Sequence, residues 1–449
     1  MESVEQMLGG WGNCPVENCH VTRPHTIDAI RNIVASGDQE NYIARGLGRA
    51  YGDSSLNADS GVMDQTLRNR FLAFDEESGV LTCEAGVSIA EIIETMLPRG
   101  WFMPVTPGTK FVTIGGAIAA DVHGKNHHVV GSFGEFVREI LLLTADGDVK
   151  RCTPDENVEL FDATIGGMGL TGVIISATFE MKRKESAYCN VTYKRTRNLD
   201  QTLEHFERTN ATNRYSVAWV DCLASGDSLG RSVIMLGNDA SADDAPTDPL
   251  KLPIKPKKSV PFFFPAIALN NFTVSAFNTL YYMKNGDSKR IVDYDEFFYP
   301  LDGVQHWNRI YGKRGFIQYQ ALFPPETSRK GLIKLLERIA KSRGASFLAV
   351  LKSSGPAGRG VMSYLHPGHT LALDFPNTGE PLRQLVRDLD DILLQHGGRV
   401  YMAKDAMTSA EAFAEMYPQL DRFREFRNEI DPNRRFLSSQ ARRLKIVEA

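Results

Sequence analysis

The order of expected strands and helices between residues 316 and 404 constrains the fold more than any other feature of the sequence. Short apolar and β-branched runs predict four strands, at 316–323, 346–352, 370–375 and 399–404. Apolar residues recur at helical spacing between the first two strands and again between the last two. This β-α-β-β-α-β order is typical of a ferredoxin-like antiparallel sheet. We therefore expect an α+β fold in which this sheet lies in one domain.

Composition limits the classes of protein to which the chain can belong. Its 449 residues predict more than one domain, and 42% hydrophobic with 24% charged residues is ordinary for globular proteins. The net charge of −4 gives no general attraction to nucleic acid, so we expect no such partner. The six cysteines are too sparse for a disulfide framework, and Cys14 and Cys19 lack the second pair of a zinc site. We expect reduced thiols in a cytoplasmic protein and no bound metal.

No segment has the character of a signal peptide or a membrane span, which needs roughly 20 apolar residues. Residues 238–258 are polar and proline-rich, which predicts a long mobile loop. Lys255, Lys257 and Lys258 then precede three consecutive phenylalanines, 262–264. Cations beside an apolar wedge suit an anionic lipid surface, so we expect residues 238–269 to act as a mobile lid with peripheral membrane contact. Packing of these aromatic rings on their own domain is an equal alternative.

Glycine-rich segments recur through the first 175 residues. ARGLGRAYGDS, residues 44–54, has three glycines within seven residues, which lets backbone N–H groups approach a ligand such as a pyrophosphate. A tight structural turn explains the same spacing. TPGT at 106–109 and TIGG at 113–116 form a second segment. The glycines of 166–172 satisfy G-x-G-x-x-G, but a strand is expected to follow them, which excludes a Rossmann nucleotide site.

The histidines of DVHGKNHH, residues 121–128, allow several interpretations. His123 and His127 could bind a metal at i, i+4, but no carboxylate motif accompanies them. A polar loop that lines a cofactor or substrate is favoured, and a packing histidine is the alternative for His123. Hydrolysis is not favoured, because the sequence has neither a G-x-S-x-G elbow nor a recognisable cysteine nucleophile motif. A large cofactor held by backbone groups, which itself supplies the chemistry, fits these features.

The motifs ARGLGRAYGDSS, VTPGTKFVTIGGAIAADVHGKNHH, IGGMGLTGVI and YMAKD resemble the FAD-linked oxidases of the vanillyl-alcohol oxidase fold. Within that superfamily they look most like the oxidases of polyprenylphosphoryl ribose, and the resemblance covers nearly the whole chain. It implies a two-domain vanillyl-alcohol-oxidase-like fold. The FAD-binding domain would comprise residues 1–184 and the C-terminal return 399–449. The substrate-binding domain, 185–398, would contain the ferredoxin-like sheet.

The resemblance also implies roles for individual residues. The implied FAD contacts are Ala44, Arg45, Gly46, Leu47, Gly48, Arg49, Ala50, Tyr51, Gly52, Asp53, Ser54, Gly108, Thr113, Ile114, Gly115, Gly116, His123, Gly124, Lys125, Asn126, Ile174 and Tyr401. The implied catalytic residues, facing the flavin ring or the sugar, are Lys404, Tyr51 and His123. The implied substrate wall consists of Trp219, Gln318, Gln320, Lys352 and Ala372. Close relatives carry cysteine where this chain has Ala372, which should leave hydride transfer intact and leaves the exact substrate open.

The activity implied by the resemblance is oxidation of the 2-hydroxyl of a polyprenylphosphoryl ribose to a ketone. Lys404 would serve as base or as stabiliser of negative charge. An NAD(P)H-dependent reductase would complete a 2′-epimerisation of the kind that supplies cell-wall arabinan, and a quinone or oxygen would reoxidise the flavin. FAD is expected to be non-covalent, because Arg49 stands where many superfamily members carry the attaching histidine. A soluble alditol or aldonolactone oxidase of the same fold is the alternative, and a flavin-binding protein without turnover is a third hypothesis.

Overall fold

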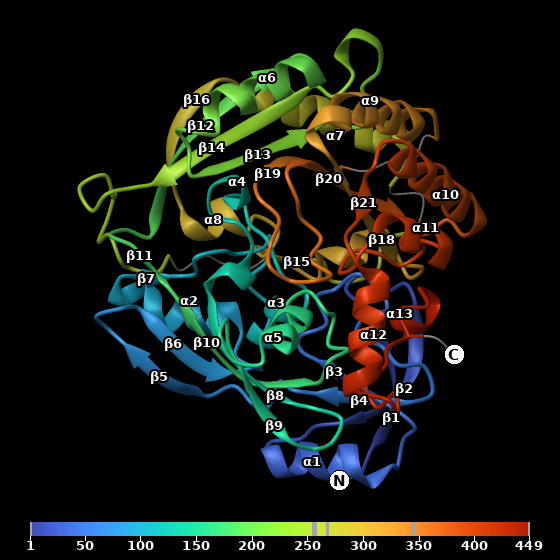
Figure 1. Ribbon diagram of the computed structural model, residues 1–449. Helices are drawn as coiled ribbons and strands as arrows, with labels where there is room; N and C mark the ends of the chain where they lie inside the picture. Colours follow the sequence, from blue (N-terminus) through green and yellow to red (C-terminus); the bar gives the residue numbers. More distant parts are fainter. Residues whose placement is uncertain (1, 254–257, 266–268, 343–346, 448–449) are drawn as a thin grey trace.

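The computed structural model describes residues 2–253, 258–265, 269–342 and 347–447, and Figure 1 shows that the chain forms a lower and an upper set of sheets. The lower set comes from the first 183 residues. One sheet has the order β1-β2-β4-β3, and a second, antiparallel sheet has the order β5-β6-β10-β8-β9. The strands are β1 (Val4–Gly9), β2 (Val16–Thr22), β3 (Tyr42–Arg45), β4 (Gly61–Asp64), β5 (Phe71–Asp75), β6 (Val80–Glu84), β8 (Val137–Leu143), β9 (Val149–Cys152) and β10 (Val173–Glu180).

Short helices connect these strands. They are α1 (Ile27–Ser36), α2 (Ile89–Met96), α3 (Ile114–Ala119), α4 (His127–Val130) and α5 (Val158–Thr164). The predicted capping box is confirmed, because Ser88 accepts a hydrogen bond from the Glu91 N–H while the Glu91 carboxylate accepts one from the Ser88 N–H. The β8–β9 hairpin expected from Asp146-Gly147 is also confirmed. The small pair β7 (Trp101–Phe102) and β11 (Lys182–Arg183) closes this part of the chain.

One eight-stranded sheet dominates the upper set (Figure 1), with the order β16-β12-β14-β13-β19-β20-β18-β21. Its strands are β12 (Tyr188–Thr196), β13 (Tyr215–Val220), β14 (Ser232–Asp239), β16 (Ser288–Asp293), β18 (Phe316–Phe323), β19 (Ala349–Ser354), β20 (Gly368–Pro376) and β21 (Arg399–Val400). The last four strands, joined by α9 (Pro325–Ser342) and α10 (Glu380–Gln395), have the antiparallel ferredoxin-like order that the sequence predicts.

Two strand boundaries differ from the prediction. The strand expected from 346 begins at Ala349, and residue 346 lies outside the described residues. The strand expected over 399–404 ends at Val400. Beyond it the chain turns, because the Tyr401 hydroxyl donates to the Ala120 carbonyl at 2.6 Å and the Lys404 N–H donates to the Tyr401 carbonyl at 2.9 Å. Lys404 therefore reaches its place on a turn rather than on a strand.

The other half of the sheet repeats the same order, which the sequence analysis did not find. Strands β12, β13, β14 and β16, with α6 (Leu199–Thr209) and α7 (Asn271–Lys284), form a second β-α-β-β-α-β unit. The two units meet at β13 and β19, so the eight strands read 4-1-3-2 and then 2-3-1-4. The repeat is roughly a hundred residues long and carries no shared motif, so a search for periods of about 20–50 residues misses it.

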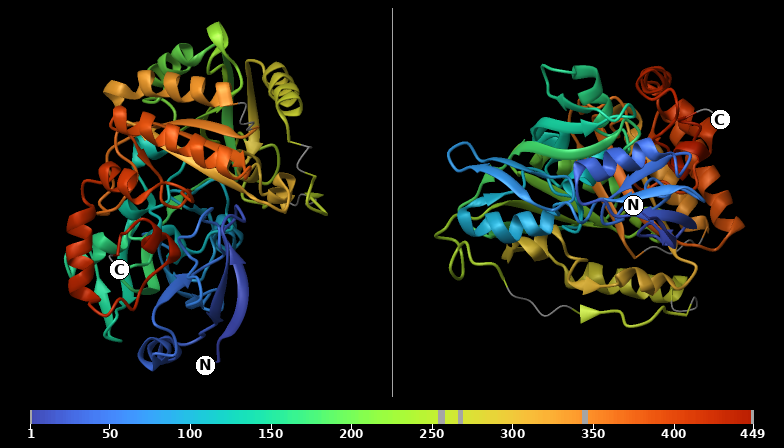
Figure 2. Two further views of the ribbon diagram at one scale, coloured as in Figure 1. Left: turned by 90° about the vertical axis from the view of Figure 1, so that its right-hand side faces the viewer. Right: turned by 90° about the horizontal axis from the view of Figure 1, so that it is seen from below.

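The helices of the two units do not occupy equivalent places. Helices α6, α9 and α10 cover one face of the sheet, and their buried side chains belong to a single apolar core. Helix α7 lies on the opposite face, as Figure 2 shows in its left view. There Tyr281 of α7 packs against Trp219 of β13 with ring centroids 4.6 Å apart.

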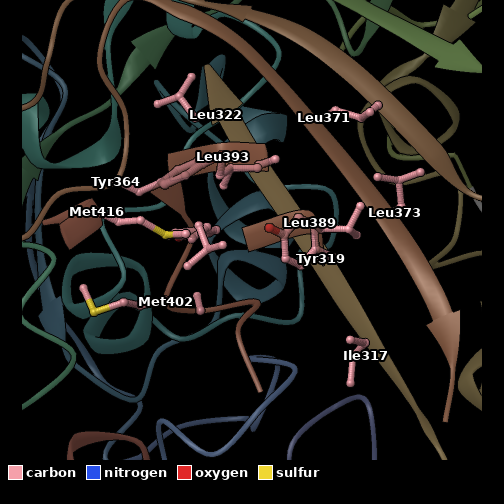
Figure 3. Close-up of a cluster of buried hydrophobic side chains, with 14 of the residues drawn as sticks. Ile317, Tyr319, Leu322, Tyr364, Leu371, Leu373, Leu389, Leu393, Met402 and Met416 are labelled. Atoms are coloured by element: carbon pink, nitrogen blue, oxygen red, sulfur yellow. The ribbon is translucent and has the colours of Figure 1, made fainter. Parts of the chain in front are cut away.

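Alternation along the strands divides the second unit into an apolar and a polar face. Figure 3 shows Ile317, Tyr319 and Leu373 among the apolar side chains beneath α10 and the C-terminal segment. The residues between them, Gln318 and Gln320, therefore face the other side of the sheet, toward the lower set. The same sequence alternation thus builds the core and the polar wall described below.

The C-terminal helices return to the lower set. They are α11 (Ala410–Met416), α12 (Leu420–Ile430) and α13 (Ser439–Arg443). The Arg443 guanidinium joins the two ends of the chain, because it donates to Asp53 at 2.8 Å and to Asp405 at 2.7 Å. No helix among the described residues is long and apolar enough to cross a membrane. All six cysteines are free thiols.

Candidate active site

A cavity of about 990 Å³ lies between the glycine-rich loops and the polar face of the eight-stranded sheet. This volume is at the upper end of the roughly 300–1,000 Å³ of ligand pockets in proteins. Its walls combine the loop around residues 44–55, the segment 106–125, the sheet, and α7 with α8 (Tyr294–Phe298). Among the described residues, no group of three or more His, Cys, Asp or Glu side chains could hold a metal ion.

Most of the site residues expected from the sequence line this cavity. They are Ala44, Arg45, Gly46, Leu47, Gly48, Arg49, Ala50, Tyr51, Ser54, Gly108, Thr113, Gly115, Gly116, His123, Gly124, Lys125, Ile174, Trp219, Gln318, Gln320, Lys352, Ala372, Tyr401 and Lys404. The structure thus brings together residues from both halves of the sheet, from the glycine-rich loops and from the C-terminal turn.

Four of the expected contacts are not among the lining residues. Gly52 and Asp53 face the C-terminal segment, where Asp53 pairs with Arg443 and a Cβ at Gly52 would meet the Asp405 carbonyl. Ile114 is fully buried in the apolar core of the lower set. Asn126 donates to the Pro104 carbonyl at 2.8 Å. The side chains of Asp53 and Asn126 brace the loops, and the sequence spacing alone could not separate that role from ligand contact.

The loop 44–55 presents backbone donors to the cavity. Gly48 has a φ of 62°, in the left-handed region that glycine adopts without strain. Within the described chain, the N–H groups of Leu47, Gly48 and Arg49 donate no backbone or side-chain hydrogen bond. Both amide atoms of Gln65, a buried lining residue, also lack a partner among the described residues. Unpaired polar groups on a cavity wall are satisfied by a ligand with several hydrogen-bonding atoms.

A hydrogen-bonded network supports the floor of the cavity on the second sheet unit: Gln318 and Tyr51 line the cavity, and the other members of the network lie behind them. The Gln318 amide donates to Asp374 at 2.6 Å and to the Tyr51 hydroxyl at 3.3 Å. The Tyr311 hydroxyl also donates to Asp374, at 3.2 Å. Burial raises the pKa of Asp374 to about 7 against these donors and the nearby Lys404. The network therefore contains one buried carboxyl whose pKa is raised toward neutral pH.

Lys404 lies above this floor. Its ammonium is 4.0 Å from the centroid of the Tyr51 ring, a cation–π contact. Burial lowers the pKa of Lys404 to about 7, the Asp374 carboxyl opposes that shift, and Lys352 adds to it. Lys404 can therefore exchange a proton near neutral pH, which a general acid or base requires.

His123 is held neutral beside these groups. The Gln320 amide donates to its Nε2 at 3.0 Å, so Nδ1 carries the proton and has no partner within the described residues. Burial, with Lys352, His127 and Lys404 nearby, holds the pKa of His123 well below its usual range. The imidazole is thus neutral, and its one N–H has no partner among the described residues.

Comparison with known proteins identifies the family. A model described as an FAD binding domain matches residues 20–153, and one described as D-arabinono-1,4-lactone oxidase matches residues 375–444. Decaprenylphosphoryl-beta-D-ribose oxidase of Mycolicibacterium smegmatis is 39% identical over 99% of this chain and 98% of its own length. This chain belongs to the decaprenylphosphoryl-beta-D-ribose oxidase family.

Other relatives are less similar to this chain or match a smaller part of it. An uncharacterized protein of Streptomyces coelicolor is 32% identical over 80% of the chain and 100% of its own length. L-gulonolactone oxidase of Bos taurus is 27% identical over only 35% of the chain and 36% of its own length. As a member of the decaprenylphosphoryl-beta-D-ribose oxidase family with an FAD-binding domain, the chain is an FAD-dependent oxidoreductase.

The residues present fit FAD. The loop donors at 47–49 suit its diphosphate, the unpaired Gln65 amide suits its hydrogen-bonding rings, and Gly108 leaves open space where any side chain would narrow the cavity. The 166–172 glycine segment is followed by a strand, as predicted, yet Met168, Gly169 and Gly172 line the cavity. The segment is therefore no Rossmann site, but it does line the cavity that fits FAD.

The sequence did not predict several residues that line this cavity or lie directly behind its wall. Asp374 follows Ala372 at the strand period, so alternation could have placed it on the cavity side of β20. Tyr311 and Gln65 carry no pattern that distinguishes them from ordinary core residues. Tyr281 was missed because a helix that lies on the cavity side of the sheet departs from the ferredoxin-like arrangement that the strand order predicts.

Proposed function

We propose that this chain oxidises the 2-hydroxyl of a polyprenylphosphoryl ribose to a ketone, as the first half of a 2′-epimerisation. The observation that carries the proposal is Lys404 on the cavity wall, stacked on Tyr51 and with a pKa near 7, in a chain related over its whole length to an oxidase named for decaprenylphosphoryl ribose. FAD, when bound, accepts the hydride that leaves the sugar carbon.

The residues of the chain would transfer the proton and position the reacting groups. Neutral Lys404 removes the proton of the reacting hydroxyl, and its ammonium form stays near the Asp374 carboxyl, which favours the charge. The Tyr51 phenol keeps its proton, because burial raises its pKa well above 10, so it orients the lysine without competing as a base. Gln318 and Gln320 fix the Tyr51 hydroxyl and the His123 ring respectively.

An anaerobic flavin-reduction screen tests the activity. Purified holoenzyme is mixed with a polyprenylphosphoryl ribose, with free alditols and with aldonolactones, and loss of the oxidised flavin absorbance is followed. Bleaching by the phosphoryl ribose alone, with a 2-keto product in the quenched mixture, is the expected outcome. Bleaching by the free sugars with none by the phosphoryl ribose rejects the proposal.

A lactone oxidase is the second candidate. The match to the D-arabinono-1,4-lactone oxidase model covers residues 375–444, the segment that carries Lys404 and the C-terminal return. The same screen separates the two candidates, because an aldonolactone has no lipid and no phosphate. If no compound bleaches the flavin, flavin binding without turnover becomes the better description.

We also propose a partner and an electron acceptor on chemical grounds. A 2-keto sugar becomes the epimeric alcohol only by reduction, so an NAD(P)H-dependent reductase would use the product. The reduced flavin needs an oxidant of the quinone or oxygen class for turnover. Measured turnover with a soluble quinone analogue, compared with air alone, ranks the two acceptors.

A peripheral membrane contact is proposed for the face that carries α7. Phe272, Leu280 and Met283 on this helix are 81%, 67% and 66% exposed, and Phe262 is 63% exposed. Apolar side chains in water beside a cavity for a lipid-linked sugar suit insertion into a bilayer. Lys255 and Lys257 of the expected lid lie outside the described residues. Lys258 pairs in β15 (Lys258–Ser259) with β17 (Val304–Gln305), and Val304 and Gln305 line the cavity.

Vesicle flotation tests this contact. The variant with Phe272, Leu280 and Met283 all changed to serine should lose at least tenfold in binding to anionic vesicles, since each apolar side chain contributes about 1.5–3 kcal/mol when buried. Serine at the exposed Val158 of α5, on the lower set, is the matched control. Equal flotation of all three proteins contradicts the contact. The six free thiols suit a reducing compartment, so we place the contact on the cytoplasmic side.

The division into an FAD-binding domain, 1–184 and 399–449, and a substrate domain, 185–398, is likewise a proposal. It is supported by the passage of the chain into the eight-stranded sheet at Tyr188, although Arg399 and Val400 still form its last strand. Limited proteolysis of the holoenzyme, with cleavage confined to the junctions near 185 and 400, would support this division. Preferential cuts inside the sheet would oppose it.

We also propose that FAD is retained without a covalent bond, and the position of Arg49 supports this. Its guanidinium lies 4.4 Å from the Trp11 ring centroid and donates to the Leu47 carbonyl at 2.7 Å, so it braces the loop. A guanidinium is no practical nucleophile for the flavin. Acid precipitation should release all yellow colour into the supernatant. A flavin mass on the intact chain would contradict this expectation.

A further inference from the structure

Among the described residues, six Lys and Arg side chains line the cavity; five of them form two separate groups, and the sixth, Arg290 on the edge strand β16, packs over Tyr193. Arg45 and Arg49 belong to the glycine-rich loop. Burial lowers the pKa of both guanidinium groups, and the nearby carboxylates of Asp64 and Asp302, respectively, oppose that shift. Lys125, Lys352 and Lys404 form the second group at the eight-stranded sheet. Lys352 disfavours the charge of both other lysines and of His123 and His127, so these groups lie close together. The second group is thus a distinct centre of positive charge.

Lys352 has no acidic partner in the part of the chain that the structure describes. It lies on β19 opposite Thr370 of β20, and it lines the cavity. Within the described residues it makes no hydrogen bond or ion pair, and burial lowers its pKa to about 8. Leaving a half-buried ammonium unpaired is costly, which argues for a ligand that supplies the missing anion.

Lys125 approaches the same region from the loop that follows His123. Its ammonium contacts the Phe297 carbonyl and lies 4.5 Å from the centroid of the Phe297 ring, and no carboxylate of the described residues pairs with it. Burial, with Lys352 as the next cause, lowers its pKa to about 7. The acidic residues that line the cavity are Glu296 and Asp302, and Asp302 accepts from the Lys110 N–H in the other region.

We propose that Lys125 and Lys352 form an anion subsite that holds the phosphate of a phosphorylated sugar substrate. This inference rests on the proposed function, and it identifies the phosphate as the group by which the substrate is selected. Two ammonium groups suit a phosphodiester, because each cation gives charge and donors to its oxygens. The diphosphate of FAD is a different anion, for which the free N–H groups of the glycine-rich loop are the matching donors.

The position of the subsite agrees with the chemistry of a ribosyl phosphate. In such a compound the phosphate is attached to C1, one carbon from the C2 that is oxidised. Lys352 influences the pKa of Lys404, the proposed base, so the phosphate subsite and the reacting hydroxyl are close neighbours in the cavity. Free alditols and aldonolactones have no group for this subsite, so the subsite separates the two candidate activities.

A pair of substrates with the same sugar tests the subsite. Anaerobic flavin reduction is measured with farnesylphosphoryl-β-D-ribose and with methyl β-D-ribofuranoside, for the parent holoenzyme and for Lys352→Met, Lys125→Met and Lys352→Arg. The methionine variants should raise the KM for the phosphoryl substrate at least tenfold more than they raise the KM for the neutral glycoside. Lys352→Arg keeps the charge and should recover most of the loss. Lys334→Met on the exposed face of α9 is the matched control.

Equal losses for the two substrates, or no loss for either, would overturn the subsite. Retained flavin absorbance and an unchanged melting temperature establish that each variant is folded. If the parent protein reduces its flavin with neither ribose, the proposed function fails. Binding of farnesyl phosphate to the holoenzyme, measured by calorimetry, then tests the subsite alone. At least tenfold weaker binding in both methionine variants supports it, and unchanged binding contradicts it.

Discussion

The two halves of the eight-stranded sheet share one strand order and differ in what they present to the cavity. The half formed by β12, β13, β14 and β16 contributes mainly apolar and aromatic side chains, such as Val217, Trp219 and Met235, and its second helix, α7, lies on the cavity side. The half formed by β18 to β21 contributes amides and cations, and both of its helices lie on the opposite face. A common topology therefore fixes the sheet, and the residues at alternate positions decide what each half presents to the cavity.

The strongest test of this division removes one cation from each half. Lys404→Ala should retain FAD and lose about 10²–10⁴-fold in the rate of substrate-driven flavin reduction, because it removes the proposed base. Arg290→Ala, on the edge strand β16 of the other half, should lose less than about tenfold, since Arg290 packs over Tyr193 and lies outside the proposed chemistry. Stopped-flow reduction measures both. Similar losses in the two variants would erase the distinction between the halves.

Stability should also differ between the helices of the two halves. Leu335 of α9 is fully buried, so Leu335→Ala should cost about 2–5 kcal/mol and lower the melting temperature clearly. Leu280→Ala on α7 should change stability by at most about 0.5 kcal/mol, because that side chain is 67% exposed. Scanning calorimetry of the two holoenzymes provides the comparison. A large loss for Leu280→Ala would mean that α7 is packed more firmly than its exposure indicates.

The pH dependence of flavin reduction tests the network on the second half. Because the pKa of Lys404 is lowered to about 7, the neutral amine accumulates above that pH, and the rate should rise through pH 7 and level off. Asp374→Asn removes an anion that raises the pKa of Lys404, so the inflection should move to lower pH by about one unit. Asp162→Asn, at a carboxylate outside the cavity that pairs with Arg359, is the control. A rate that falls through pH 7 would instead assign Lys404 a role as a stabilising cation.

The smallest expected effect concerns the contact that holds α7 over the cavity. Tyr281→Ala removes the ring that packs on Trp219. Aromatic pairs contribute about 0.5–1.5 kcal/mol beyond area burial, so KM for the lipid-linked substrate should rise roughly two- to twelvefold. The limiting rate of flavin reduction should stay unchanged, because the helix lies outside the proposed chemistry. A lower limiting rate with an unchanged KM would place α7 in the reaction itself.

The sequence predicted the parts of this molecule that depend on local pattern. Strand and helix periodicity located β18, β20, α9 and α10, and the capping box located the start of α2. Most of the residues that motif resemblance indicated line the cavity, including Lys404 and Lys352. It could not place Asp53 or Asn126, because glycine-rich loops use neighbouring polar side chains both to contact a ligand and to brace themselves.

Features that depend on contacts between distant segments were beyond the sequence. The first half of the sheet was missed because its second helix follows a long polar segment and lies on the unexpected face. The end of β21 was predicted four residues too late, because Tyr401 bonds to Ala120, which is 281 positions away in the chain. The network of Asp374 joins residues from three separate segments, and its altered pKa arises only when the fold buries them together.

The Arg443 clamp has a consequence for the order of events during synthesis. Arg443 binds two carboxylates: Asp53 belongs to the glycine-rich loop, and Asp405 follows Lys404 in the C-terminal turn. Arg443 is synthesised 390 positions after Asp53. At about 5–20 residues per second, a ribosome needs roughly 20–80 seconds to cover that interval. During that interval the glycine-rich loop lacks the hydrogen bonds from Arg443 that hold it in the folded protein. We therefore expect tight binding of the cofactor late in biogenesis.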